Sequence, residues 1–304
     1  MIGPNGAGKS TLLLHLNGIL KPKEGSILID GAEIDYSKDG LMKLRQRVGI
    51  VFQNPDDQLF SPTVFEDMAF GPVNLGLDDD EVERRVRGSL ERVGMGGYGD
   101  RPPHHLSGGE KKKKIAIAGI LAMKPEIMVL DEPTAGLDPQ AADDIIDTLL
   151  ELGRDGITVI ISSHDVEIIS QFAERIIVLN DGRLIADGGS EEILSRPEII
   201  RRANLKLPKT ADLMNRLRNA GFRVDVKLTV EDAYHELLHT LGEKKYHELL
   251  HVLGEERQHE LIHLLGEEKY HELLHVLGEE RQHELIHLLG EEKYHELLHA
   301  LKKD

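Results

Sequence analysis

The chain has 304 residues, of which 40% are apolar and 30% charged, and a formal net charge of −17. Its length suggests two domains of roughly 150 residues, the lack of cysteine excludes a disulfide framework and thiolate metal sites, and no apolar run is long enough for a membrane-spanning helix. The negative charge argues against nucleic acid as a partner, and residues 1–10 leave no room for a secretory signal, so we expect a soluble, cytosolic protein.

The first motif is a phosphate-binding loop at residues 3–10. The letters GPNGAGKS fit the pattern G-x-x-x-x-G-K-[ST], in which glycines let main-chain N–H groups surround phosphate oxygens at a helix start. We expect Lys9 to contact the β- and γ-phosphates of a nucleotide and the Ser10 hydroxyl to reach Mg²⁺. A glycine-rich turn without a ligand is the alternative. The residues assigned to the nucleotide are Gly3, Pro4, Asn5, Gly6, Ala7, Gly8, Lys9, Ser10 and Thr11.

Short β-branched runs alternate with helical patterns over the next two hundred or so residues, which predicts an α/β fold with a mainly parallel sheet. The expected strands cover residues 48–52, 127–130, 158–162 and 176–179, and residues 183–186 form the second arm of a hairpin. Residues from about 55 to 120 are expected to form a helical subdomain, in which Asp78 begins one helix and Gly94 ends it.

The strand at 127–130 ends in two carboxylates, Asp131 and Glu132. Asp131 can hold Mg²⁺, and Glu132 can polarise the attacking water. By itself such a pair is more often a solvated turn. The phosphate loop favours the catalytic interpretation, because the two elements supply complementary parts of one phosphoryl-transfer site.

A third motif, Leu106-Ser107-Gly108-Gly109-Glu110, resembles the signature of ATP-binding-cassette (ABC) ATPases, which are P-loop NTPases. With the other two motifs, the resemblance covers residues 1–230 approximately. It implies ATP and Mg²⁺ as cofactors and a head-to-tail dimer, either of one chain or of two related chains. In that dimer Ser107, Gly108 and Gly109 of one subunit would cap the γ-phosphate held by the other.

The same resemblance implies roles for three further residues and completes the metal site. Gln53 would sense metal and water, Asp138 would bridge the dimer, and His164 would contact the γ-phosphate. The catalytic set is therefore Glu132, His164 and Gln53, and the metal ligands are Ser10, Gln53 and Asp131. Such an arrangement is preorganised electrostatics aimed at the transferring phosphoryl group.

Residues 52–60 and 69–72 look like the ATPase subunit of energy-coupling-factor importers, a group that takes up cobalt, nickel or vitamins. In that group the surface beside the Gln53 loop receives a helix from an integral membrane subunit, which places the ATPase at the cytoplasmic face of the membrane. Phe60, Val64 and Phe65 are candidates for the apolar lining of that surface, and a place in the buried core is the alternative for them.

Two features depart from the family pattern. Only Met1 and Ile2 precede the phosphate loop, so we expect an N-terminally truncated chain whose sheet lacks its central strand and which lacks an aromatic residue to stack on adenine. The second is the run Lys111-Lys112-Lys113-Lys114, which is one residue longer than the pattern and has lysine in place of an arginine. We interpret these lysines as a solvated basic face at a helix start.

Residues 231–304 carry a 12-residue repeat with paired histidines at positions i and i+4, beginning at His235 and His239. Each copy is formally H-E-x-x-H, but positions 245, 257, 269, 281 and 293 hold lysine or arginine instead of the third histidine of a zinc protease. Capture of Ni²⁺, Co²⁺ or Zn²⁺ is one interpretation of this helical, histidine-rich tail. An amphipathic interaction tail expanded by duplication is the other.

These features predict three segments: an ABC-type nucleotide-binding domain at 1–205, a small extension at 206–230 and the repeat at 231–304. The predicted function is an ATP-hydrolysing subunit that energises a membrane importer, with cobalt or nickel as cargo. The alternative is a truncated, inactive cassette that acts as a metal-binding or interaction protein through its tail. Binding of MgATP would separate the two.

Overall fold

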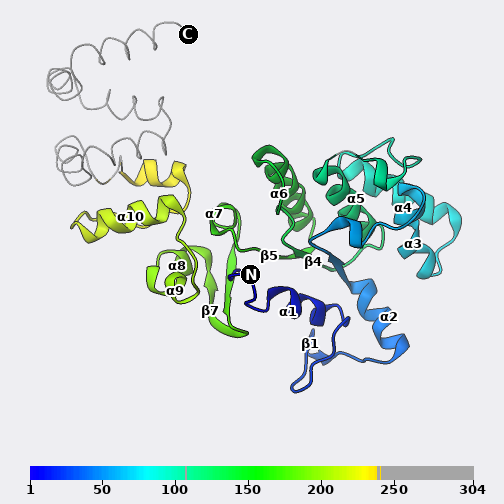
Figure 1. Ribbon diagram of the computed structural model, residues 1–304, viewed down its shortest axis with the longest axis horizontal. Coiled ribbons are helices and arrows are strands. Elements are labelled where there is room, and N and C mark those ends of the chain that lie inside the picture. The colour runs from blue at the N-terminus through cyan, green and yellow to red at the C-terminus, as the bar shows by residue number, and fades with distance from the viewer. Residues whose placement is uncertain (107, 238–239, 241–304) are drawn as a thin grey trace, which may run out of the picture. The chain divides into compact units, whose positions relative to one another are not determined.

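The computed structural model of the chain describes residues 1–106, 108–237 and 240, and Figure 1 shows its elements. The chain forms two compact units. The first holds Met1–Ile193 and Glu198–Lys206, and the second holds Leu194–Pro197 with the described residues from 207 onward. Apart from residues 231–237 and 240, the histidine repeat lies outside the described residues, so its helical structure stays a prediction.

Helices and strands follow one another as the sequence pattern predicts, with a helical insert between two parts of an α/β domain. The strands are β1 (Leu28–Ile29), β2 (Ala32–Glu33), β3 (Val48–Val51), β4 (Ile127–Asp131), β5 (Thr158–Ser162), β6 (Arg175–Asn180) and β7 (Arg183–Gly189). The α-helices are α1 (Lys9–Leu16), α2 (Lys38–Arg47), α3 (Val64–Asn74), α4 (Asp79–Arg92), α5 (Gly109–Leu121), α6 (Pro139–Arg154), α7 (Val166–Ile169), α8 (Ser190–Leu194), α9 (Pro197–Arg202) and α10 (Lys209–Asn219). Two 3₁₀ turns, η1 (Pro55–Asp57) and η2 (Pro103–His105), lie in the insert.

The predicted strands are confirmed, and three of them form a parallel sheet in the order β3-β4-β5. The register pairs Asp131 with Ser162, so the carboxyl ends of β4 and β5 lie at the same edge. Strands β6 and β7 form the predicted antiparallel hairpin. Functional side chains that follow β4 and β5 are therefore gathered at one edge of the sheet.

The expectation that the sheet lacks a central strand is corrected in part by Ile2. This residue makes parallel bridges to Ser163 after β5 and to Val178 in β6. Its N–H donates to the carbonyl of Ile177 at 2.8 Å, and its own carbonyl accepts from Leu179 at 2.9 Å. The phosphate loop thus leaves the sheet from a position between β5 and β6.

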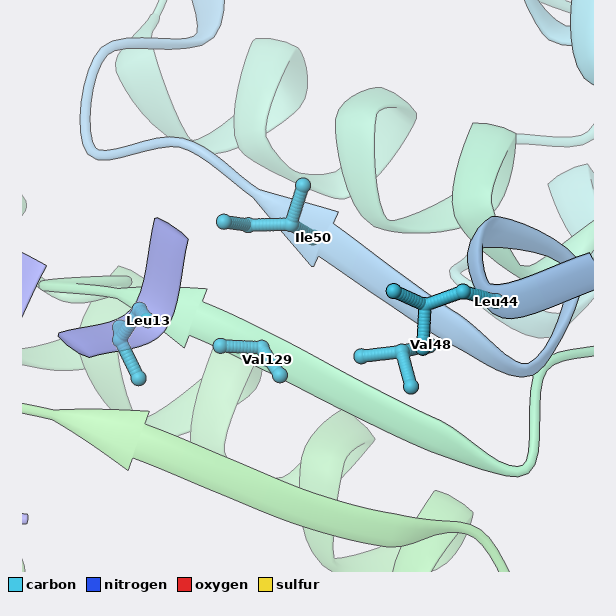
Figure 2. Close-up of a cluster of buried hydrophobic side chains, with 5 residues drawn as sticks. All are labelled: Leu13, Leu44, Val48, Ile50 and Val129. Atoms are coloured by element: carbon cyan, nitrogen blue, oxygen red, sulfur yellow. The ribbon is translucent and has the colours of Figure 1, made fainter. Parts of the chain in front are cut away.

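A buried cluster of Leu13, Leu44, Val48, Ile50 and Val129 holds α1 and α2 against one face of β3 and β4 (Figure 2). Val48 and Ile50 point to the same face because side chains alternate along a strand. Gly49 points to the other face, where an added Cβ would lie 2.2 Å from Cγ2 of Ile120 in α5. Glycine at this position lets α5 pack close to the sheet, so helices cover both faces.

Helices α3, α4 and α5 contact one another and form the predicted helical subdomain (Figure 1). Asp78 caps α4 by accepting a hydrogen bond from the N–H of Glu81 at 2.9 Å, and Gly94 follows the helix with φ of 71°, so the predicted start and end are confirmed. None of the helices in the described ranges has both the length and the apolar character needed to span a bilayer.

Candidate active site

The phosphate loop is shaped by glycine at two positions. An added Cβ on Gly3 would lie 2.5 Å from the carbonyl oxygen of Leu179, so only glycine fits this close to β6. Gly8 caps α1 with φ of 96°, a left-handed conformation that favours glycine. The loop therefore turns sharply into α1 and leaves its main-chain N–H groups at the helix start, where an anion is stabilised.

Lys9 is the charged centre of this loop. Its side chain is only 6% exposed, and its ammonium donates hydrogen bonds to the carbonyls of Gly3 at 2.8 Å and Pro4 at 3.3 Å. The same nitrogen lies 3.3 Å from Oε1 of Glu132. The structure thus brings together the loop lysine and the second carboxylate of the acidic strand end, which are far apart in the sequence.

Glu132 is held on both its main chain and its side chain. Its φ of 47° is unusual for a residue with a side chain, and its N–H donates to both the carbonyl and the Oγ of Ser162 at 3.1 Å. Its Oε2 lies 2.9 Å from Nδ1 of His164, in hydrogen-bond contact. Two basic side chains, Lys9 and His164, therefore flank one buried carboxylate.

The three predicted metal ligands line one pocket. Ser10, Gln53 and Asp131 border a cavity of 370 Å³ together with Asn54, Asp57 and the apolar side chains Leu13, Leu14, Ile50 and Phe52. Hydroxyl, amide and carboxylate oxygens are the ligands that Mg²⁺ prefers, so the donor set fits this ion. Ser162, fully buried at the end of β5, donates a hydrogen bond to Oδ1 of Asp131 and so orients it.

The signature residues lie elsewhere in the subunit. Gly108 and Gly109 are exposed at the start of α5 and do not line the pocket that holds Ser10 and Asp131. Ser107 lies outside the described residues. Asp138 caps α6 by accepting from the N–H of Ala141 at 2.9 Å. Within one subunit, the structure therefore leaves the predicted γ-phosphate cap separate from the phosphate loop.

Comparison with known proteins identifies the family. The profile of the ABC transporter family matches residues 1–135. The energy-coupling factor transporter ATP-binding protein EcfA of Methanothermobacter thermautotrophicus is 75% identical over 242 residues, which are 80% of this chain and 78% of that protein. EcfA of Methanocaldococcus jannaschii is 51% identical over 245 residues, which are 80% of this chain and 88% of that protein. The chain belongs to the EcfA family of ABC transporter ATP-binding subunits.

Solved structures agree with this assignment. The structure of cbiO1 from Clostridium perfringens, part of the ABC transporter complex cbiONQ, matches with a TM-score of 0.60 and 48% identity over 70% of this chain and 85% of that one. A dimeric post-hydrolysis state of the ATP-binding cassette MJ0796 with ADP and Pi matches with a TM-score of 0.56 and 31% identity over 62% of this chain and 83% of that one. As an ABC ATPase, the chain hydrolyses ATP, with Mg²⁺ as the cofactor.

One buried lysine beside Glu132 was not predicted from the sequence. Lys113 was predicted to lie on a solvated basic face, but its side chain is 5% exposed, and the prediction is wrong for this lysine. Its ammonium donates to the carbonyl of Ala135 at 2.7 Å and to that of Glu132 at 3.3 Å. Burial lowers the pKa of Lys113 to about 8, so it remains largely an ammonium at neutral pH. The periodicity of α5 contains the missing signal, because Lys113 shares its face with Ile117 and Leu121, four and eight residues on.

The apolar surface beside the Gln53 loop differs from the predicted one. Phe60, 68% exposed, lines a groove of 510 Å³, but the ring that packs edge-to-face on it, at 5.1 Å between centroids, is that of Phe70. Val64 is fully buried and Phe65 is half-buried, and neither lines the groove. The reason is helical phase: Phe70 follows Phe65 by five residues in α3 and therefore lies on another face.

Proposed function

We propose that this EcfA-type chain is the ATP-hydrolysing subunit that energises a membrane importer, with cobalt or nickel ions as the cargo. The observation that carries the proposal is the joining of Lys9, Glu132 and His164 beside a pocket lined by Ser10 and Asp131. The choice of cargo rests on the sequence resemblance. The similarity to an energy-coupling factor transporter protein and to a part of the cbiONQ complex supports the class of importer.

In this proposal each side chain has a defined task. Lys9 and the N–H groups of the loop bind the β- and γ-phosphates, and Glu132 polarises the attacking water while His164 contacts the γ-phosphate. Ser10, Gln53 and Asp131 would hold Mg²⁺, which adds positive charge beside the phosphates when it is bound. Because Lys9 already pairs with Glu132 at 3.3 Å, nucleotide phosphates and the carboxylate compete for the same ammonium.

Two subunits, identical or related, would pair head to tail around ATP. Gly108 and Gly109 support this arrangement, since both are exposed and outside the pocket of their own chain. A dimer is also the state named for the solved MJ0796 cassette. In the pair, Ser107, Gly108 and Gly109 of one subunit would cap the γ-phosphate on the loop of the other.

Transport by the assembled complex tests the function. Purified subunits reconstituted with their membrane partners into vesicles should take up Co²⁺ or Ni²⁺ only when MgATP is present on the side of this chain. Uptake of neither ion, with ATP hydrolysis intact, would contradict the cargo but not the ATPase. Metal binding by the histidine repeat remains a prediction from the sequence, because the repeat is almost entirely outside the described residues.

The groove lined by Phe60 and Phe70 is the proposed binding site for a helix of the membrane subunit. Asp67 fixes its rim by accepting hydrogen bonds from the N–H groups of Phe60 and Ser61, both at 2.7 Å. An aspartate at either ring position would place a charge in an apolar interface, and we expect Phe60→Asp or Phe70→Asp to weaken association with the membrane subunit at least about tenfold. Co-purification in detergent measures this.

The matched control is Leu184→Asp on β7, since Leu184 is 61% exposed but does not line the groove. It should associate like the unmodified chain, and all three variants should keep the basal rate of MgATP hydrolysis. If both phenylalanine variants associate normally, the membrane subunit does not bind in this groove.

A further inference from the structure

The buried lysine of helix α5 touches the residue that carries the catalytic carboxylate. Lys113 lies in α5, and its side chain extends to the segment that follows β4, where its ammonium donates hydrogen bonds to two main-chain carbonyls. These belong to Glu132 and Ala135, which form a turn closed by a hydrogen bond from Ala135 N–H to Glu132 O at 3.1 Å. Lys113 therefore binds both ends of the turn that follows the strand.

This turn determines where the Glu132 carboxylate points. Its first residue has the φ of 47° noted above, and its carboxylate lies against Lys9 and His164. A left-handed conformation at a residue with a side chain persists only where neighbouring groups hold it. Ser162 holds the N–H of Glu132, and Lys113 holds its carbonyl, so the peptide units before and after the Glu132 Cα are both fixed.

Folding alone does not call for a charge at position 113. Ile117 and Leu121, which lie four and eight residues further along the same face of α5, are both apolar and buried. Burying an ammonium is unfavourable, and an apolar side chain of similar length would avoid that cost. The lowered pKa of Lys113 reflects the same desolvation.

The neighbouring lysines make different contacts. The Lys112 ammonium pairs with Asp56 at 2.6 Å, and that of Lys114 pairs with Glu110 at 2.5 Å and Asp144 at 3.3 Å. Lys111 lies over the ring of Tyr98, 5.5 Å from its centroid. None of these three contacts involves the turn at 132–135, so the neighbours provide controls in the same helix.

We propose that Lys113 is a positioning residue for ATP hydrolysis: it fixes the turn at 132–135 so that the Glu132 carboxylate keeps its place beside the phosphate loop. The proposal rests on the catalytic role of Glu132 given above. Because Lys113 belongs to the helix that begins with Gly109, it also connects the signature segment of a subunit to that subunit's own catalytic carboxylate.

The test compares Lys113→Met, Lys113→Arg and Lys111→Met in the full chain. We expect Lys113→Met to lower kcat about tenfold to a hundredfold, while KM and the Kd for MgATP stay within about threefold, because only the orientation of the base changes. Lys113→Arg should recover most of kcat, since it keeps a cationic donor, and Lys111→Met should leave kcat unchanged. Should Lys113→Met fail to fold, Lys113→Gln, which keeps a shorter neutral donor, is expected to show the same split between kcat and Kd.

A double-mutant cycle separates positioning from general stability. In a Glu132→Gln background, adding Lys113→Met should lower the single-turnover rate of hydrolysis little further. The effects of two substitutions that act through the same group are not additive. An equal loss in both backgrounds, or unchanged kcat in Lys113→Met, would overturn the proposal. If Glu132→Gln itself keeps the original kcat, the proposed function fails first, so the two failures are distinguishable.

Discussion

Replacing Glu132 by glutamine is expected to lower kcat for ATP hydrolysis by about 10²–10⁴-fold, the range that a positioned general base contributes. Glutamine keeps the shape of the side chain but cannot accept a proton, and it no longer pairs as an anion with Lys9 at 3.3 Å. Removing this anion leaves Lys9 free for the phosphates, so the Kd for MgATP should be unchanged or lower. Steady-state hydrolysis and nucleotide titration of the same preparation give the two quantities.

Glu126→Gln is the matched control for this substitution. Glu126 directly precedes β4, at the other end of the strand from Glu132, and its exposed carboxylate pairs with Arg47 at 2.7 Å. Exposed ion pairs contribute little to stability, so this variant should hydrolyse ATP at the original rate. A Glu132→Gln variant with the kcat of the control would show that the water is activated by another group.

Much of this site could be predicted because its signals are local in the sequence. The phosphate loop fixes which residues surround an anion, and an apolar strand that ends in carboxylates places them at the edge of a parallel sheet. Ser10, Gln53 and Asp131 indeed line one pocket, and Glu132 meets Lys9 and His164. Their catalytic and metal-binding roles remain proposals for experiment.

What the sequence could not predict depends on packing between segments. The periodicity of α5 could have marked Lys113 as buried, but its contact with the carbonyl of Glu132 depends on how α5 packs against the segment that follows β4. Phe60 and Phe70 meet because a loop and the last half of α3 lie together, ten residues apart. The pairing of Ile2 could not be predicted either, because its partners, Ser163 and Val178, come far later in the chain.

Replacing Lys9 by methionine is expected to weaken MgATP binding and to lower kcat, the latter by about 10²–10³-fold, as when one preorganised donor to a transition-state charge is lost. Methionine keeps much of the length and apolar character of the buried stem, so the loop should stay folded. It removes the cation that the phosphates need and leaves the 6% exposed Glu132 with His164 as its remaining basic contact. Nucleotide titration and single-turnover hydrolysis measure the two losses.

The pattern across the two variants is what identifies the site. Lys9→Met should lose affinity and rate together, whereas Glu132→Gln should lose rate alone, because in the proposed mechanism Lys9 binds the phosphates in every state and Glu132 acts on the water. Lys21→Met provides the control, since Lys21 lies over the ring of Tyr36 at 5.2 Å and does not line the pocket of Ser10 and Asp131. If Lys9→Met binds MgATP with unchanged affinity, the phosphates do not bind at this loop. Nucleotide and Glu132 would then not compete for the ammonium of Lys9.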